Sequence, residues 1–122
     1  MAIRLAMIST LLALAVPASA YAEAIAIKGS FGNKDGCAYA KTQESTGSDD
    51  FFLLTKDDVT TAASVCTFGK TIATSKGTIT VAVTCEDEGD TSQDVVDVVP
   101  VKSGYSVVFK DGTKWGPLAP CK

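Results

Sequence analysis

The chain lacks histidine entirely and holds a single arginine, Arg4, among its 122 residues. Without histidine, neither a Ser-His-Asp triad nor a Cys-His dyad can form. No serine stands in the S-x-x-K spacing of Ser-Lys nucleophiles, and no glycine-rich loop runs into Lys-Ser or Lys-Thr as a phosphate-binding loop does. These absences leave carboxylates, Lys, Tyr and Ser for catalysis, so the sequence argues against several classes of enzyme.

Long apolar runs are also missing, except at the start of the chain. There, Arg4 precedes an apolar run over residues 5–16, and small residues follow. This is the order of regions in a secretory signal peptide, and the run is shorter than the roughly 20 residues that span a bilayer. The small residues fit cleavage after Ala20 or after Ala22. We therefore expect an exported, soluble protein, periplasmic or secreted, without a stable membrane anchor.

Removing the signal peptide, residues 1–22, leaves a single domain over residues 23–122 with ten Lys, no Arg and fourteen acids, a net charge of −4. Phosphates attract cationic surfaces, so nucleic acid and anionic membranes are poor partners for it. All four cysteines remain, and an even number in an exported chain predicts two disulfides, with three possible pairings. None has C-x-x-C spacing, so neither zinc nor another cofactor is predicted. The cysteines are Cys37, Cys66, Cys85 and Cys121.

Short runs rich in Val, Thr, Ile and Phe, separated by Gly, Asp and Ser, predict an all-β domain. Its strands should form a small antiparallel meander that closes into a barrel or folds into a sandwich, since closure removes exposed edges. Turns are expected at residues 101–104 and at Asp111-Gly112, a polar loop over 40–50 and an extended tail over 116–122. The expected strands are 24–31, 50–55, 64–73, 78–86, 94–101, 104–110 and 114–118, with shorter ones near 37–40 and 58–62.

The apolar pattern also sets the register of the hairpin around residues 74–77. Both apolar faces must meet the core, and a slip of one residue would turn one of them to solvent. A two-residue loop at Ser75-Lys76 satisfies this condition, whereas a bulge at Gly77 would not. The hairpin is therefore predicted to carry one disulfide, which leaves the other two cysteines to form the second. The predicted pairs are Cys66 with Cys85, Phe68 with Val83, Ile72 with Ile79 and, by elimination, Cys37 with Cys121.

Four acids gather within five residues directly after Cys85: Glu86, Asp87, Glu88 and Asp90. Ca²⁺ takes several oxygen ligands, but the ligand spacing of an EF-hand loop is missing. Paired carboxylates for glycoside hydrolysis need a cleft between them, for which a domain of this size has little room. A hydrated turn is the simplest interpretation. The functional interpretation is an acidic loop that speeds the encounter with a basic protein.

Trp115 is the only tryptophan of the chain. Aromatic side chains mostly serve burial, so we expect it in the core or as a plug at one end of the barrel. The functional alternative is an interface anchor beside Tyr105 or Tyr39. The polar loop over residues 40–50 has two comparable interpretations, a recognition loop or a plain connector.

These features follow a particular order along the chain. That order is Gly29-x-Phe31, Cys37, Phe52-Leu53-Leu54-Thr55, Cys66, Cys85-x-x-x-Gly89, Asp111-Gly112 and Cys121. It resembles small four-cysteine exported proteins of proteobacteria whose role is unassigned, over nearly the whole of residues 23–122. A second resemblance, carried by Ser103-Gly104-Tyr105 alone, is to the periplasmic lysozyme inhibitors of the membrane-bound and C-type class. It implies a small antiparallel barrel with an inhibitory Ser-Gly loop.

The sequence therefore predicts a non-enzymatic binding or structural module of the periplasm, whose protein partner would be basic if the acids contact it. The alternatives are an inhibitor of a basic lysozyme and a small carboxylate-dependent hydrolase. No catalytic, metal-binding or cofactor-binding residue is predicted. The candidate partner-binding residues are Glu86, Asp87, Glu88, Asp90, Ser103, Gly104, Tyr105 and Trp115.

Overall fold

The computed structural model describes residues 23–122. The signal peptide expected over residues 1–22, with its cleavage sites, lies outside the described residues. The described chain forms eight strands and one helix. In chain order they are β1 (Phe31–Gly32), α1 (Lys34–Thr42), β2 (Phe52–Leu54), β3 (Asp58–Thr61), β4 (Ser64–Ser75), β5 (Thr78–Asp87), β6 (Asp90–Val101), β7 (Gly104–Phe109) and β8 (Lys114–Pro120).

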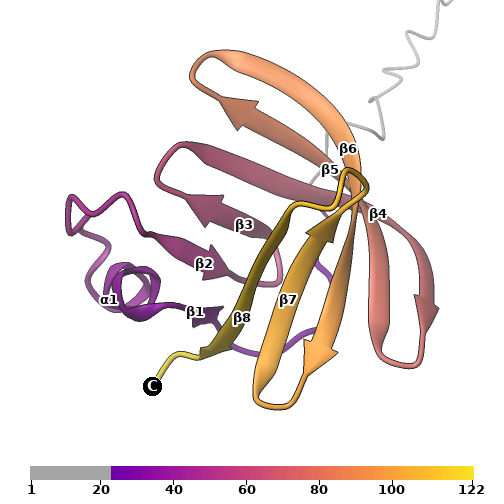
Figure 1. The fold of residues 1–122 in the computed structure, drawn as a ribbon, viewed down its shortest axis with the longest axis horizontal. Helices are drawn as coiled ribbons and strands as arrows, with labels where there is room; N and C mark the ends of the chain where they lie inside the picture. Colours follow the sequence, from indigo (N-terminus) through magenta and orange to yellow (C-terminus); the bar gives the residue numbers. More distant parts are fainter. Residues whose placement is uncertain (1–22) are drawn as a thin grey trace, which may run out of the picture.

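The strands form one closed antiparallel barrel in which each strand pairs with the next along the chain (Figure 1). The barrel closes where β8 returns to β1, pairing Phe31 with Pro120 and Gly32 with Ala119. The all-β meander predicted from the sequence is thus confirmed, and it takes the form of a barrel rather than a sandwich. Closure gives main-chain partners to two strands that would otherwise be edges.

Apolar side chains fill the interior of the barrel. Strand β5 shows the alternation most clearly, since Ile79, Val81 and Val83 are buried and the residues between them are partly exposed. Successive residues of a strand point to opposite faces, so a period of two buries one face and leaves the other in water. Phe68 on β4 and Leu54 on β2 are the largest side chains that are wholly buried. The core is therefore built from the inward positions that the alternation predicts.

The turn of the β4–β5 hairpin lies one residue away from its predicted place. Lys76 and Gly77, rather than Ser75 and Lys76, occupy the two loop positions, with φ angles of 52° and 83°. A type I′ turn requires a positive φ at both positions, and glycine adopts a positive φ without steric cost. The preference of the turn for Gly77 therefore moves the register at this end of the hairpin by two residues from the predicted one.

Two bulges in the middle of β4 absorb this shift. Toward the start of β4 the predicted register is confirmed, with Phe68 opposite Val83. Near the turn the prediction is wrong, because Ile79 pairs with Thr74 and not with Ile72. Each bulge adds one unpaired residue and reverses the face to which the following side chains point. As a result Ile72, predicted for the core, is 57% exposed.

The short strand predicted near residues 37–40 is wrong, because these residues lie in α1. Asn33 caps the N-terminus of the helix, and its side-chain oxygen accepts the N–H of Gly36 at 2.9 Å. Asp35 adds a carboxylate to the first turn, where the helix dipole favours negative charge. The helix also takes the start of the predicted polar loop and leaves residues 43–51 as the connection to β2.

The two ends of the domain also differ from their predictions. Of the strand predicted at 24–31, only the last residue enters β1. The segment before it packs against the β2–β3 turn, where the N–H of Ile25 donates to the carbonyl of Lys56 at 2.8 Å. Burial of Ile25 and Ile27 produces strand-like alternation without a strand. Conversely, the tail predicted over residues 116–122 is largely β8.

Two predicted turns have different outcomes. The turn at residues 101–104 is confirmed. The turn at Asp111-Gly112 holds three residues rather than two, because the N–H of Phe109 donates to the carbonyl of Thr113 at 2.8 Å. Gly112, with a φ of 95°, supplies the left-handed residue that ends a three-residue hairpin loop.

Both predicted disulfides are confirmed. Cys66–Cys85 joins β4 to β5 with Cα atoms 4.0 Å apart, and Cys37–Cys121 joins α1 to the residue after β8 with Cα atoms 5.2 Å apart. Disulfides persist in oxidising compartments, so this chain fits a compartment outside the cytosol. The one helix of residues 23–122, α1, lacks the length and apolar character of a bilayer span.

Candidate functional site

The β5–β6 hairpin concentrates the negative charge of the domain. Between Thr78 and Val101 the chain has six acidic residues and no lysine or arginine. The remaining described residues have slightly more lysines than acids. The turn of this hairpin projects from the barrel at the top of Figure 1. Its four exposed acids, which we call the acidic tip, are Glu86, Asp87, Glu88 and Asp90.

The hairpin turn places like charges side by side. Asp87 and Asp90 form the last residue pair of the ladder, and Glu88 follows Asp87 with a φ of 48°. Like charges directly opposite each other on antiparallel strands destabilise the pair. The hairpin has no lysine that could offset this repulsion. A cation bound at the acidic tip would therefore relieve a repulsion that the fold itself creates.

A disulfide fixes the base of the acidic tip. Cys85 directly precedes Glu86, and its bond to Cys66 crosslinks β5 to β4. Cys66 is 1% exposed, so the crosslink is anchored in the core. One pair farther out, Glu86 lies opposite Val65 in the same ladder. The acids therefore project from a base that is held covalently as well as by main-chain hydrogen bonds.

A surface groove of about 460 Å³, the tip groove, runs beside these acids. One wall comes from the β3–β4 turn and the start of β4, with Ala62, Ala63 and the 37% exposed Val65. The opposite wall includes Glu86 and Glu88 of the hairpin. Long basic side chains bury their methylene stems against apolar surface and keep the charged end in water. The tip groove offers both kinds of surface to a Lys or Arg side chain of a partner.

The predicted partner-binding residues Ser103, Gly104 and Tyr105 lie at the opposite end of β6. The acidic tip includes the first residue of this strand, whereas Ser103 lies in the turn that follows its last residue and Gly104 begins β7. The strand has 12 residues, which span roughly 35 Å. The structure therefore does not bring the two groups of predicted residues together on one surface.

Gly104 has a packing role in the barrel. A Cβ atom at this position would overlap the carbonyl oxygen of Leu118 on the neighbouring strand β8. Leu118 is itself 2% exposed, so β8 cannot retreat without disturbing the core. The Ser103-Gly104-Tyr105 sequence thus has a structural explanation for its glycine that does not depend on lysozyme inhibition.

Gly104→Ala is expected to lower the free energy of unfolding by about 2–3 kcal/mol, because β7 and β8 must move apart to admit the methyl group. Ser103→Ala, at the exposed neighbouring position, should change it by less than about 0.5 kcal/mol. Urea unfolding followed by circular dichroism measures both values. Equal stabilities for the two variants would contradict the close approach of the two strands.

Trp115 packs against the core. Its ring centroid lies 4.6 Å from that of Phe109 and 6.0 Å from that of Phe52. Tyr105 and Tyr39, considered above as neighbours in an interface anchor, each pair with a different phenylalanine. The three aromatic side chains therefore belong to separate contacts, and the structure does not assemble them into one cluster.

Two carboxyls outside the acidic tip have shifted pKa values. Burial raises the pKa of Asp58, although hydrogen bonds from Thr55 and Thr60 act in the opposite direction. At the β7–β8 turn, hydrogen bonds from Thr113 lower the pKa of Asp111. Both shifts arise within local turns. In the part of the chain that the structure describes, no three acids or cysteines converge as metal ligands.

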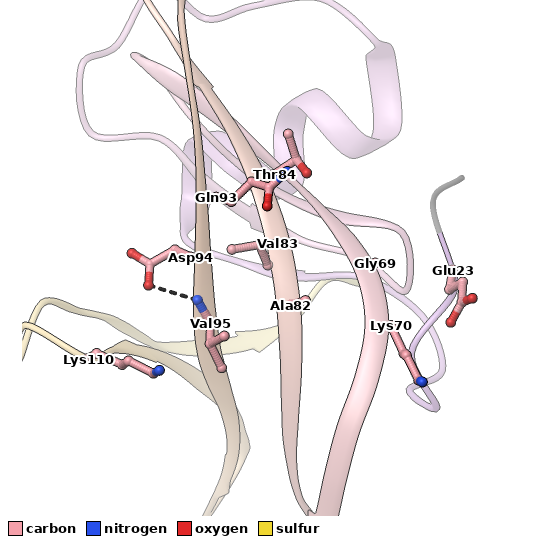
Figure 2. Close-up of a pocket in the computed structure, with 10 residues that line it drawn as sticks. All are labelled: Glu23, Gly69, Lys70, Ala82, Val83, Thr84, Gln93, Asp94, Val95 and Lys110. Atoms are coloured by element: carbon pink, nitrogen blue, oxygen red, sulfur yellow. Dashed lines mark hydrogen bonds between the residues drawn. The ribbon is translucent and has the colours of Figure 1, made fainter. Parts of the chain in front are cut away.

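A larger groove of about 620 Å³, the sheet groove, crosses the outer side of β4, β5 and β6. Figure 2 shows two carboxylates at its rims, with Glu23 beyond β4 and Asp94 on the far side of β6. Neighbouring strands are about 4.8 Å apart, and Asp94 lies on β6 two strands away from β4, so at least two strand spacings, roughly 10 Å, separate these groups. Carboxyl pairs of glycosidases lie roughly 5–9.5 Å apart. The spacing does not favour the hydrolase alternative.

Sequence reasoning missed the sheet groove. Its floor includes Gly69 on β4 and Ala82 on β5, two small residues on the outer face of neighbouring strands. A Cβ atom added at Gly69 would lie 3.5 Å from the carbonyl oxygen of Ala82, which places the two residues side by side. Small residues at neighbouring outward positions could have indicated this groove. The alternation of apolar residues predicts only which side chains point inward, so it gave no reason to consider them.

Comparisons with protein-family models, with curated proteins and with solved structures found no match to this chain. The two resemblances noted in the sequence therefore stay predictions. Function has to be inferred from the charge and shape of the surface.

Proposed function

We propose that this protein is a non-enzymatic binding module of the periplasm whose partner is a basic protein. The acidic tip is the observation that carries the proposal. It holds much of the negative charge of the domain at the end of one hairpin, and the Cys66–Cys85 disulfide ties that hairpin to the core. Charge complementarity of this kind raises association rates and suppresses binding of acidic partners.

Two features favour docking over an idle hydrated turn. Asp87 and Asp90 stand opposite each other, so the unbound tip carries a repulsion that a cationic partner removes. Local costs of this kind are typical of functional sites, where stability is not the selected property. The tip groove also supplies apolar surface next to Glu86 and Glu88, as the stem of a basic side chain requires.

Two disulfides and the export signal expected over residues 1–22 support the periplasmic assignment. Lysozymes are basic proteins that periplasmic chains encounter, so inhibition of a lysozyme is one form that this binding could take. In that case the acidic tip would make the first contact, because Ser103-Gly104-Tyr105 lies at the other end of β6. A basic lysozyme is therefore the probe of choice.

Neutralising the acidic tip is expected to weaken binding to a basic lysozyme by roughly tenfold or more at low salt. The variant changes the four acids to amides, and isothermal titration calorimetry measures the dissociation constant. Binding by the unaltered domain should weaken as the salt concentration rises, because salt screens exposed charges. Lysozyme turnover, measured in parallel, distinguishes an inhibitor from a binder. The substitutions are Glu86→Gln, Asp87→Asn, Glu88→Gln and Asp90→Asn.

A matched control changes the net charge by the same amount elsewhere. It neutralises four exposed acids outside the β5–β6 hairpin, and its affinity should stay within about threefold of the unaltered domain. An equal loss in both variants would show that only net charge matters, and no binding by the unaltered domain would refute the proposal. The control substitutions are Glu44→Gln, Asp49→Asn, Asp50→Asn and Asp57→Asn.

A further inference from the structure

Strand β6 has an open edge next to the acidic tip. It pairs with β5 from Asp90 onward, but its pairing with β7 begins at Val96, opposite Phe109. Within residues 23–122, the stretch from Asp90 to Val95 therefore has a strand on one side and none on the other. We call this stretch the β6 edge.

The main-chain groups of alternate residues face outward along the β6 edge. In a hairpin with a two-residue turn, the residues that flank the turn bond to each other, and the direction then alternates along the strand. Thr91, Gln93 and Val95 accordingly direct their N–H and C=O groups away from β5. The N–H of Val95 donates to the carboxylate of Asp94 at 2.7 Å (Figure 2). Both main-chain groups of Thr91 and Gln93 are left for an added strand.

We propose that the β6 edge binds an extended basic segment of the partner as an added strand. This inference rests on the proposed function, in which the acidic tip attracts the basic partner. Strand addition takes its affinity from main-chain hydrogen bonds and its specificity from alternate side chains. Because the β6 edge begins at Asp90, which also belongs to the acidic tip, one bound segment contacts both.

The side chains of the β6 edge define the composition of that segment. Even-numbered residues, Asp90 and Asp94 among them, point to one face, and odd-numbered ones such as Gln93 and Val95 point to the other, above the sheet groove. Residues directly opposite on antiparallel strands share a face. The segment therefore alternates Lys or Arg, set against the acids, with Thr or Val. Lys110 lines the sheet groove and repels a basic residue placed beyond Val95.

A second copy of this chain fits the β6 edge poorly. If Thr91 paired with Gln93 of a second copy, Asp90 would stand opposite Asp94, and the two-fold symmetry would repeat this like-charge pair. Charged residues on an edge strand are a common protection against the association of identical strands. Asp90 and Asp94 therefore disfavour pairing with a second copy of this chain, and the same two carboxylates favour pairing with a basic strand.

The test uses a short acetylated and amidated peptide of alternating Lys and Thr. In the proposed register its Thr residues lie opposite Thr91 and Gln93, so the Thr N–H groups face β6 and the Lys N–H groups face solvent. Main-chain N-methylation of every Thr should weaken binding by about tenfold or more, whereas N-methylation of every Lys should change it by less than about threefold. Nuclear magnetic resonance titration gives the affinity and should show the largest amide shifts at Thr91 and Gln93.

Gln93→Pro provides a second test on the protein side. Proline is tolerated on an edge strand where the N–H faces solvent, so the barrel should persist while the outward N–H at this position is lost. Affinity for the unmodified peptide should fall by about tenfold. Circular dichroism checks that the variant is folded. If it does not fold, the two N-methylated peptides, measured with the unaltered domain, still show whether main-chain hydrogen bonds to the β6 edge contribute to binding.

The outcomes separate this inference from the function on which it rests. If lysozyme binds through the acidic tip but the two N-methylated peptides bind equally, the added strand is refuted and the proposed function stands. If neither lysozyme nor the unmodified peptide binds, both are refuted. If sedimentation shows a dimer, and the amide shifts that accompany dimerisation in nuclear magnetic resonance spectra map to the β6 edge, that edge binds a second copy and the inference is overturned. Weaker binding of the Thr-methylated peptide alone supports it.

Discussion

Phe68→Ala is expected to lower the free energy of unfolding by about 4 kcal/mol, a large part of the stability of a domain of this size. The ring is 0% exposed and is the largest wholly buried side chain. The main chain of Phe68 also holds two other segments, because its N–H donates to Asp57 and its carbonyl accepts the N–H of Glu23, both at 3.0 Å. These links limit collapse around the missing ring, so the cavity term remains. Urea unfolding monitored by circular dichroism measures the change.

Ile72→Ala is the matched control on the same strand. The apolar pattern assigns Phe68 and Ile72 to one face of β4, but the structure leaves Ile72 57% exposed. Truncating it should therefore cost less than about 0.5 kcal/mol. A loss of 2 kcal/mol or more, typical of a buried Ile, would mean that the uninterrupted register is correct and that the two bulges are not formed.

The hairpin shows which parts of a β-fold periodicity can and cannot predict. Alternation identifies the inward set of β5 and the disulfide between Cys66 and Cys85, because burial enforces a period of two. It fails near the turn, where the positive φ of Lys76 and Gly77 fixes the loop. Bulges then reconcile the turn with the core, and nothing in a period of two signals them. Ile72 was misplaced for this reason.

The helix was missed for a different reason. Residues 34–42 have little apolar periodicity, and the capping oxygen of Asn33 is a better guide to the helix start than hydrophobicity is. The N-terminal segment shows the converse error. Ile25 and Ile27 alternate with exposed residues as they would in a strand, and both are buried, but neither belongs to a strand of the barrel. A local capping signal thus marks the helix, whereas tertiary packing, which a single sequence does not display, decides the conformation of the N-terminal segment.

The candidate site was predictable in charge but not in shape. The acids of the tip can be read directly from the sequence. Their position at the end of a hairpin follows from Cys85 being the last inward residue of β5. The β6 edge was not predictable, since it depends on where pairing with β7 stops, at Val96. A closed barrel removes its terminal edges by pairing β1 with β8. A closed barrel can still leave an open edge wherever one strand extends beyond the strand it pairs with. In this protein β6 extends beyond β7, and the open edge lies next to the acidic tip.

Removing the Cys37–Cys121 disulfide is expected to lower the free energy of unfolding by about 4–5 kcal/mol. The bond closes a loop with a sequence separation of 84, against 19 for Cys66–Cys85. In the chain-entropy model the longer loop constrains the unfolded state more. The expected stabilisation is about 4.5 kcal/mol for the first bond and about 3 kcal/mol for the second. The variant is Cys37→Ala with Cys121→Ala, and urea unfolding under non-reducing conditions measures its stability. A loss below 2 kcal/mol would show that the unfolded chain is already compact.

The matched variant, Cys66→Ala with Cys85→Ala, separates stability from binding. Its loss should also approach 4 kcal/mol, because a cavity at the buried Cys66 adds to the shorter loop. The two variants should differ in lysozyme binding, measured at a temperature where both are folded. Loss of the bond next to Glu86 loosens the base of the acidic tip and should weaken binding, whereas loss of the bond between α1 and the end of β8 should leave it unchanged. Equal binding by both variants would mean that the tip docks without needing a rigid base. Charge alone would then account for the interaction, and the disulfide beside the tip would serve the fold only.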